Sequence, residues 1–212
     1  VLTGVARLTK DGQSVSGDTF SMINLPSGEL LMALSDGMGS GTSAFDDSKN
    51  VIELLEQMSE AGFSQTSAIR LINSLYMSDQ EFENYATLDI SLINLYKGEC
   101  SFLKNGAVGT YVLNQGKMYC IEGQSLPMGV VSDAEPYIGK MSLYPGDYVI
   151  MMTDGVADMF SQERYNLEKF IKQIEIVNPG DMAQAIVDEA VSRNKGAVSD
   201  DMSVIVAGVW EN

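Results

Sequence analysis

The chain has 212 residues, of which 45% are hydrophobic and 20% charged, a balance typical of a globular domain large enough to bury a core. Its 29 acidic and 13 basic residues give a formal net charge of −16, which disfavours contact with nucleic acid or an anionic membrane surface. Because the sequence has no histidine, catalytic triads, cysteine–histidine pairs and histidine-ligated zinc are excluded.

The first part of the chain reads as strands followed by a pair of helices. Strands are expected over 4–9, 20–25 and 29–35, the last two forming a hairpin around a Pro-Ser-Gly turn. After Gly41, apolar residues at helical spacing predict one helix that begins near Asp47 or Ser48 and ends at Gly62. A second helix is predicted over 66–77. These two helices cover an adjoining sheet.

The second part returns to strands and ends with two more helices and a strand. An antiparallel meander is expected from four strands, 87–96, 100–104, 107–113 and 117–121. Later elements are a strand over 148–153, helices over 166–177 and 181–193 with Asp181 as N-cap, and a strand over 202–210. Since strands and helices do not alternate, antiparallel sheets with helices outside them are predicted.

Cysteine content and chain ends set the expected context. Cys100 and Cys120 have no CxxC spacing and are interpreted as free thiols in a reducing compartment. The sequence shows neither a signal peptide nor an apolar run of about 18 residues. Because the chain begins at Val1, it is expected to be a domain of a longer protein.

Acidic residues close two strongly apolar strands. Asp36-Gly37 follows one such strand, Asp154-Gly155 follows another, and Asp200 and Asp201 precede the last predicted strand. Carboxylates at strand ends can converge at one edge of a sheet, where their oxygens suit a hard divalent cation. Asp-Gly is also a common turn dipeptide, so turn structure alone remains an alternative.

The hairpin adds two further candidate ligands. Asp18 begins the strand that pairs with the strand ending at Asp36, so both carboxylates are expected at the same end of the hairpin. Gly37 has no Cβ, which permits close approach of its backbone, and its carbonyl could bind an ion directly. The segment 36–41 fails as a dinucleotide loop, a P-loop or an EF-hand, because the required glycine, lysine and oxygen ligands are missing.

Carboxylates of this kind support hydrolysis of a phosphate ester. Two Mg²⁺ or Mn²⁺ ions bridged by a carboxylate lower the pKa of a shared water, and the resulting hydroxide attacks phosphorus in line. The residues alone do not distinguish a phosphatase from a Mg²⁺-dependent nucleotide hydrolase. A third interpretation of the sequence is a non-catalytic acidic interaction domain.

Four short motifs resemble, in order and spacing, those of metal-dependent protein phosphatases of the 2C type. They are Ser16-Gly17-Asp18, the stretch from Ser35 to Gly41, Thr153-Asp154-Gly155 and Asp200-Asp201-Met202. The likeness extends over essentially the whole chain, includes Asp89, Val108 and Gly129 in their local motifs, and is strongest to the bacterial branch that acts in sporulation. It implies an α+β fold, a four-layer αββα sandwich of two mainly antiparallel sheets flanked by helix pairs, as one domain over 1–212.

The resemblance also implies a site. Asp36 would bridge two divalent cations, Mn²⁺ or Mg²⁺; Asp154 and Asp200 would hold one of them. The Gly37 carbonyl and, partly through water, Asp18 would hold the other. Asp201 would support the ligands without touching a metal, and no organic cofactor is implied. Asp36, Asp154 and Asp200 would act in catalysis through metal-activated water.

The chain departs from the eukaryotic pattern at Met38, where those enzymes commonly have histidine. It also lacks the family's phosphate-binding arginine near Asp18, and Arg7 is the nearest basic candidate.

The implied substrate is phosphoserine on an anti-anti-sigma factor-like protein. The predicted helix pair, 46–77, would be a regulatory switch that responds to a homodimer or another partner. The domain would be the cytoplasmic part of a larger membrane-anchored bacterial protein, itself without contact to membrane or nucleic acid.

Overall fold

The computed structural model describes residues 1–39, 41–78, 85–132, 135–160, 165–174 and 177–211. The chain divides into two compact units. The terminal unit comprises Val1–Gln13, Val108–Ile121 and Leu143–Asn212, and the central unit comprises Ser14–Ala107 and Glu122–Ser142. Each unit contains one five-stranded sheet, and every strand pairing within it is antiparallel.

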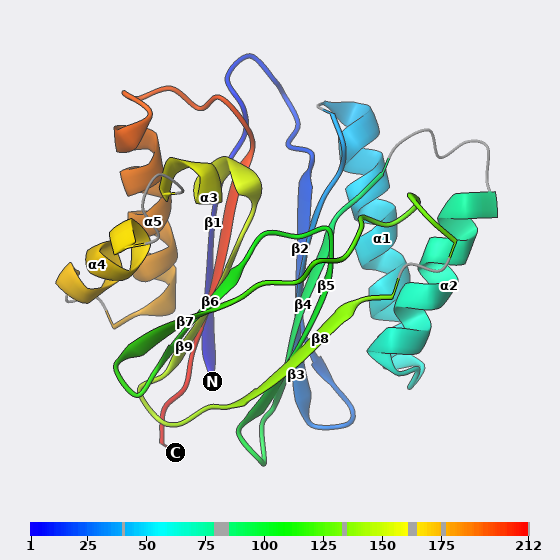
Figure 1. Ribbon diagram of the computed structural model, residues 1–212, viewed down its shortest axis with the longest axis horizontal. Helices are drawn as coiled ribbons and strands as arrows, with labels where there is room; N and C mark the ends of the chain where they lie inside the picture. Colours follow the sequence, from blue (N-terminus) through cyan, green and yellow to red (C-terminus); the bar gives the residue numbers. More distant parts are fainter. Residues whose placement is uncertain (40, 79–84, 133–134, 161–164, 175–176, 212) are drawn as a thin grey trace. The chain divides into compact units, whose positions relative to one another are not determined.

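The terminal unit has the strand order β1-β10-β9-β6-β7 (Figure 1). Its strands are β1 (Leu2–Leu8), β6 (Thr110–Asn114), β7 (Lys117–Ile121), β9 (Tyr148–Met152) and β10 (Met202–Gly208). Its helices are α3 (Asp154–Phe160), α4 (Tyr165–Gln173) and α5 (Pro179–Arg193). The α5 helix packs along β1 and β10, the two neighbouring strands at one edge of the sheet.

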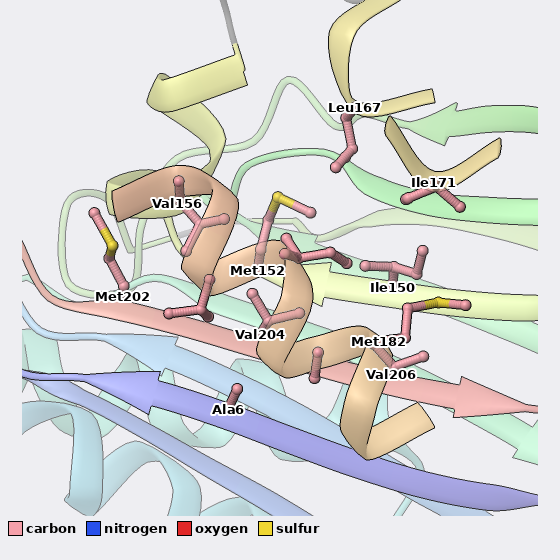
Figure 2. Close-up of a cluster of buried hydrophobic side chains, with 14 of the residues drawn as sticks. Ala6, Ile150, Met152, Val156, Leu167, Ile171, Met182, Met202, Val204 and Val206 are labelled. Atoms are coloured by element: carbon pink, nitrogen blue, oxygen red, sulfur yellow. The ribbon is translucent and has the colours of Figure 1, made fainter. Parts of the chain in front are cut away.

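The core of the terminal unit forms where this sheet meets its helices. Met202, Val204 and Val206 alternate along β10, so their side chains share one face and pack against residues of α5 such as Met182 (Figure 2). The α5 helix begins after Asn178, whose Oδ1 accepts the N–H groups of Gly180 and Asp181 at 2.8 and 3.3 Å. The predicted N-cap, Asp181, therefore lies inside the first turn.

The central unit has the strand order β2-β3-β4-β5-β8. Its elements are β2 (Asp18–Leu25), β3 (Glu29–Asp36), α1 (Thr42–Glu60), α2 (Gln65–Ser78), β4 (Leu88–Asn94), β5 (Glu99–Asn105) and β8 (Tyr137–Ser142). The helices α1 and α2 lie side by side, and α1 packs on β2 and β3 (Figure 1). Buried apolar side chains of both helices, among them Val51, Leu55 and Ile69, form a core with those of the sheet.

The structure corrects two further expectations about these elements. The first helix begins at Thr42, earlier than Asp47 or Ser48, because the glycine-rich loop ends at Gly41. The predicted meander forms only in part: β4 pairs with β5 and β6 pairs with β7, but β5 and β6 pair with β8 and β9 instead of with each other. Two elements were not predicted: β8 is mostly exposed and lacks an apolar run, and α3 is too short for helical periodicity to be visible. None of the described helices combines the length and hydropathy that a membrane span requires.

Candidate metal centre

The central unit places Asp18 and Asp36 directly opposite each other. They are the first paired residues of the β2–β3 hairpin, where Asp18 is only 1% exposed and Asp36 is partly buried. The backbone N–H of Asp18 donates to Ser16 Oγ at 3.2 Å. The prediction that both carboxylates lie at one end of the hairpin is therefore confirmed.

Backbone hydrogen bonds hold the segment that follows β3. The N–H of Asp36 donates to Thr87 Oγ1 at 3.0 Å, and the N–H of Thr87 donates to the Asp36 carbonyl at 2.8 Å. The N–H of Gly37 donates to the Gly17 carbonyl at 3.2 Å. An ideal Cβ on Gly37 would lie 1.9 Å from the carbonyl oxygen of Ala44 in α1. Glycine is required here by this close approach of two backbones.

Asp154 lies at the junction of β9 and α3 in the terminal unit. The strand residues before it are buried, but Asp154 itself is an exposed residue in the first turn of α3. The buried Thr153 fixes the junction: its N–H donates to the Ser203 carbonyl, and its Oγ1 accepts the Ser203 N–H, both at 3.0 Å. The carboxylate thus projects from a rigid strand end without being sealed in the core.

A second carboxylate acts on Asp154. Partial burial of the carboxyl group raises the pKa of Asp154, the charge of Asp200 raises it further, and a hydrogen bond from the Gly155 backbone offsets part of the shift. The first turn of α3 approaches the chain near Asp200 closely, since an ideal Cβ on Gly155 would lie 2.2 Å from the Asp201 carbonyl oxygen. The terminal unit therefore holds a pair of mutually repelling carboxylates.

Asp200 and Asp201 have different surroundings. Asp201 is buried, and its Oδ1 accepts the backbone N–H of Lys10 at 2.9 Å, which ties the end of β1 to the start of β10. The Asp200 side chain is half exposed, and its Oδ1 lies 3.6 Å from Lys10 Nζ. The predicted division, with Asp200 as ligand and Asp201 as support, agrees with these contacts but stays a prediction.

These residues fit a divalent cation by their chemistry. The donors are carboxylate and carbonyl oxygens, which Mg²⁺ and Mn²⁺ prefer, and a cation would relieve the repulsion between Asp154 and Asp200. Among the residues that the structure describes, no three acidic or cysteine side chains lie close enough together within one unit to hold a metal ion. Each unit has one pair of carboxylates of its own, Asp18 with Asp36 in the central unit and Asp154 with Asp200 in the terminal unit.

Two residues near these pairs were not anticipated. Lys10 contacts Asp200 and Asp201 although 191 positions separate it from Asp201, and a sequence pattern gives no signal for such a pairing. Thr87 precedes β4 and bonds to Asp36 only because β3 and β4 are neighbours. Cys100 and Cys120 are free thiols, as expected.

Comparison with known proteins places the chain in a family. The family model described as stage II sporulation protein E matches residues 26–210. Stage II sporulation protein E of Priestia megaterium is 34% identical over 213 residues, which cover 99% of this chain and 36% of that protein. The chain thus spans about a third or less of the length of the curated relatives it matches.

Solved structures agree with this relationship. The PP2C phosphatase domain and a fragment of the regulatory domain of the Bacillus subtilis protein match with a TM-score of 0.91 and 31% identity, over 99% of this chain and 62% of that one. The catalytic domain of the serine/threonine protein phosphatase PstP, solved with two manganese ions, shares the fold with a TM-score of 0.79 and 18% identity, over 99% and 98% of the two chains.

The two antiparallel sheets with their helices, together with these likenesses, confirm the predicted fold class and the predicted resemblance. The chain therefore belongs to the stage II sporulation protein E family and corresponds to its PP2C-type phosphatase domain.

Proposed function

We propose that this domain hydrolyses phosphoserine or phosphothreonine on a protein substrate in a reaction that depends on divalent cations. The observation that carries the proposal is the pair of carboxylates in each unit, Asp18 with Asp36 and Asp154 with Asp200. All four lie in the short segments that resemble the PP2C-type motifs, and family membership supports the activity.

The proposed ligand set is the one that the family resemblance implies. Asp36 would hold both cations, Asp154 and Asp200 would hold one of them, and the Gly37 carbonyl and, partly through water, Asp18 would hold the other. When bound, Mn²⁺ or Mg²⁺ would offset the charge of the phosphoryl oxygens and lower the pKa of an attacking water. A relative of the same fold was solved with two manganese ions, and another with magnesium, which supports this choice of metals.

The chain's own residues set the geometry around these ligands. The hydrogen bonds to Thr87 and Gly17 fix the backbone of Asp36 and Gly37, and the bond from Lys10 to Asp201 fixes the start of β10. Met38 is 53% exposed and can neither donate nor accept a proton. We expect the leaving serine oxygen to take its proton from solvent.

Family membership supports a proposal for the substrate and the partners. We propose a phosphorylated anti-anti-sigma factor-like protein as substrate, and a larger membrane-anchored protein whose cytoplasmic part includes this domain. We also propose that a second copy or a regulator acts through α1 and α2. These helices contact the sheet and each other partly through polar groups: Thr19 Oγ1 and Ser48 Oγ lie 2.8 Å apart, and Tyr76 OH donates to the Asp47 carbonyl at 2.5 Å.

The test is Mn²⁺-dependent phosphate release from a phosphoserine anti-anti-sigma protein, with Asp154→Asn beside the wild type. Release that requires Mn²⁺ and is lost in the variant supports the proposal. A wild type that binds Mn²⁺ but releases no phosphate, with or without a regulator, would instead indicate a non-catalytic interaction domain. Faster hydrolysis of nucleotides than of the phosphoprotein would indicate a nucleotide hydrolase.

A further inference from the structure

The buried face of α2 contains one polar residue with an unusual set of contacts. Asn73 is 1% exposed and lies among the apolar side chains of Ile69, Ile72 and Tyr76. A buried amide is unfavourable at such a position unless its donors and acceptor are hydrogen-bonded. The partners of Asn73 therefore indicate what the residue does there.

All the partners of the Asn73 amide lie in one irregular segment. Its Oδ1 accepts the N–H of Gly129 at 2.9 Å, and its Nδ2 donates to the carbonyls of Val131 and Ser132 at 2.8 and 3.1 Å. Residues 129–132 belong to no helix or strand. One side chain thus provides the backbone of this segment with three hydrogen bonds of the kind that a neighbouring strand would otherwise provide.

Backbone hydrogen bonds through Ala86 connect the same segment to Gly37, the proposed metal ligand. Met128 is fully buried, and its N–H donates to the Ala86 carbonyl at 2.9 Å. Ala86 forms isolated antiparallel bridges with both Met128 and Gly37. On the other side, the N–H of Met38 donates to the Tyr85 carbonyl at 2.8 Å. An unbroken series of backbone bonds therefore links the segment held by Asn73 to the peptide groups of Gly37.

We infer that Asn73 is a positioning residue for the Gly37 carbonyl. The inference rests on the proposed function, in which that carbonyl binds a cation. Asn73 fixes 128–132 against α2, this segment fixes Ala86, and Ala86 borders Gly37. Carbonyl ligands bind well only when their direction is fixed before the ion arrives, and outer partners of ligands typically change metal affinity by about 10- to 100-fold.

The test compares Asn73→Leu with Ile72→Val. Leucine has the same branched side-chain skeleton as asparagine, with a larger volume, but forms no hydrogen bonds. The control removes a methyl group from the adjacent, fully buried Ile72, so it loosens the packing of α2 but keeps the three hydrogen bonds between Asn73 and 129–132. Amide hydrogen exchange is measured on both variants and on the wild type without metal, and Mn²⁺ binding is then measured by calorimetry.

We expect Asn73→Leu to accelerate exchange at Gly129, Met128 and Met38 more than at Ile90 in β4, and to weaken Mn²⁺ binding about tenfold. Ile72→Val should leave Met38 protection and Mn²⁺ affinity at wild-type levels. Equal behaviour of the two variants would overturn the inference. If Asn73→Leu does not fold, Asn73→Ser, which keeps one hydroxyl, takes its place and is held to the same criteria.

Failure of the proposed function and failure of the positioning role of Asn73 give different results. A wild type that neither binds Mn²⁺ nor releases phosphate would refute the proposed function, whereas exchange at Met38 would still report on the link to Asn73. A wild type that binds Mn²⁺, paired with an Asn73 variant of equal affinity and equal Met38 protection, would refute the positioning role alone.

Discussion

Replacing Gly37 with alanine tests the contact that fixes the site's backbone. The added Cβ would lie 1.9 Å from the Ala44 carbonyl oxygen and 2.6 and 2.9 Å from the carbonyl carbon and Cα of the same residue. Ordinary contacts between such atoms are about 3.5 Å, so the two backbones must separate by more than about 1 Å. The Ala44 atoms are backbone atoms and not the end of a flexible side chain, so they cannot move aside easily. The strain therefore falls on α1 and on the Gly37 peptide.

The size of the effect follows from that displacement. Overpacking of this kind costs about 1–3 kcal/mol of unfolding free energy, which for a chain of this size lowers Tm by roughly 2–12 °C. A shift of about 1 Å in a ligand group reduces turnover by about 100-fold. We therefore expect Gly37→Ala to be folded, moderately less stable, and far less active at any given Mn²⁺ concentration.

The assay is thermal unfolding together with Mn²⁺ titration of phosphate release. Gly146→Ala is the matched control: Gly146 has φ +91° and an ideal Cβ there meets no atom within 4 Å, so alanine introduces backbone strain without a clash. The control should lose stability yet keep the wild-type dependence on Mn²⁺. A Gly37→Ala protein with wild-type Tm and Mn²⁺ dependence would refute the reasoning about close approach.

Further predictions concern charge, burial and capping. Because the folded-state pKa of Asp154 is raised, its ionisation destabilises the metal-free fold. Asp154→Asn should therefore raise the Tm of that form at neutral pH, through a gain in unfolding free energy of less than about 1 kcal/mol after solvent screening. The gain should vanish as the pH falls below the unfolded-state pKa of an aspartate. An unchanged or lower Tm for Asp154→Asn at neutral pH would contradict this. Asp200→Ala should lose one of the two Mn²⁺ ions with little change in stability. Asp201→Ala should instead cost about 1–3 kcal/mol in denaturant unfolding, because the Lys10 N–H loses its buried acceptor. The reverse pattern would exchange their roles. Asn178→Ala should cost about 1 kcal/mol by removing the α5 cap, measured by thermal unfolding, with phosphate release unchanged below the transition.

Local features of the site were predictable from sequence. The pairing of Asp18 with Asp36 follows from a hairpin closed by a short turn, because the turn alone fixes which residues face each other. The helix pair after Gly41 was visible because its apolar residues repeat at helical spacing. Both predictions depend on contacts between residues close in the chain.

Features that depend on distant pairings were not predictable in this way. Consecutive strands usually pair, but β5 takes β8 as its neighbour and β6 takes β9, so the chain changes sheets between Asn105 and Thr110. No periodicity marks such a change. The bond from Lys10 to Asp201 and the contacts of Asn73 arise from packing, and the sequence around either residue reads as an ordinary turn or helix.

The central claim is that Asp36 is shared by two cations, and the stoichiometry of Mn²⁺ binding tests it most directly. Calorimetric titration of the wild type, Asp36→Asn and Asp154→Asn should give two, no and one tightly bound ions, respectively, since the bridging carboxylate supports both sites and Asp154 only one. A wild type that binds two ions and an Asp36→Asn variant that still binds both with unchanged affinity would contradict the account.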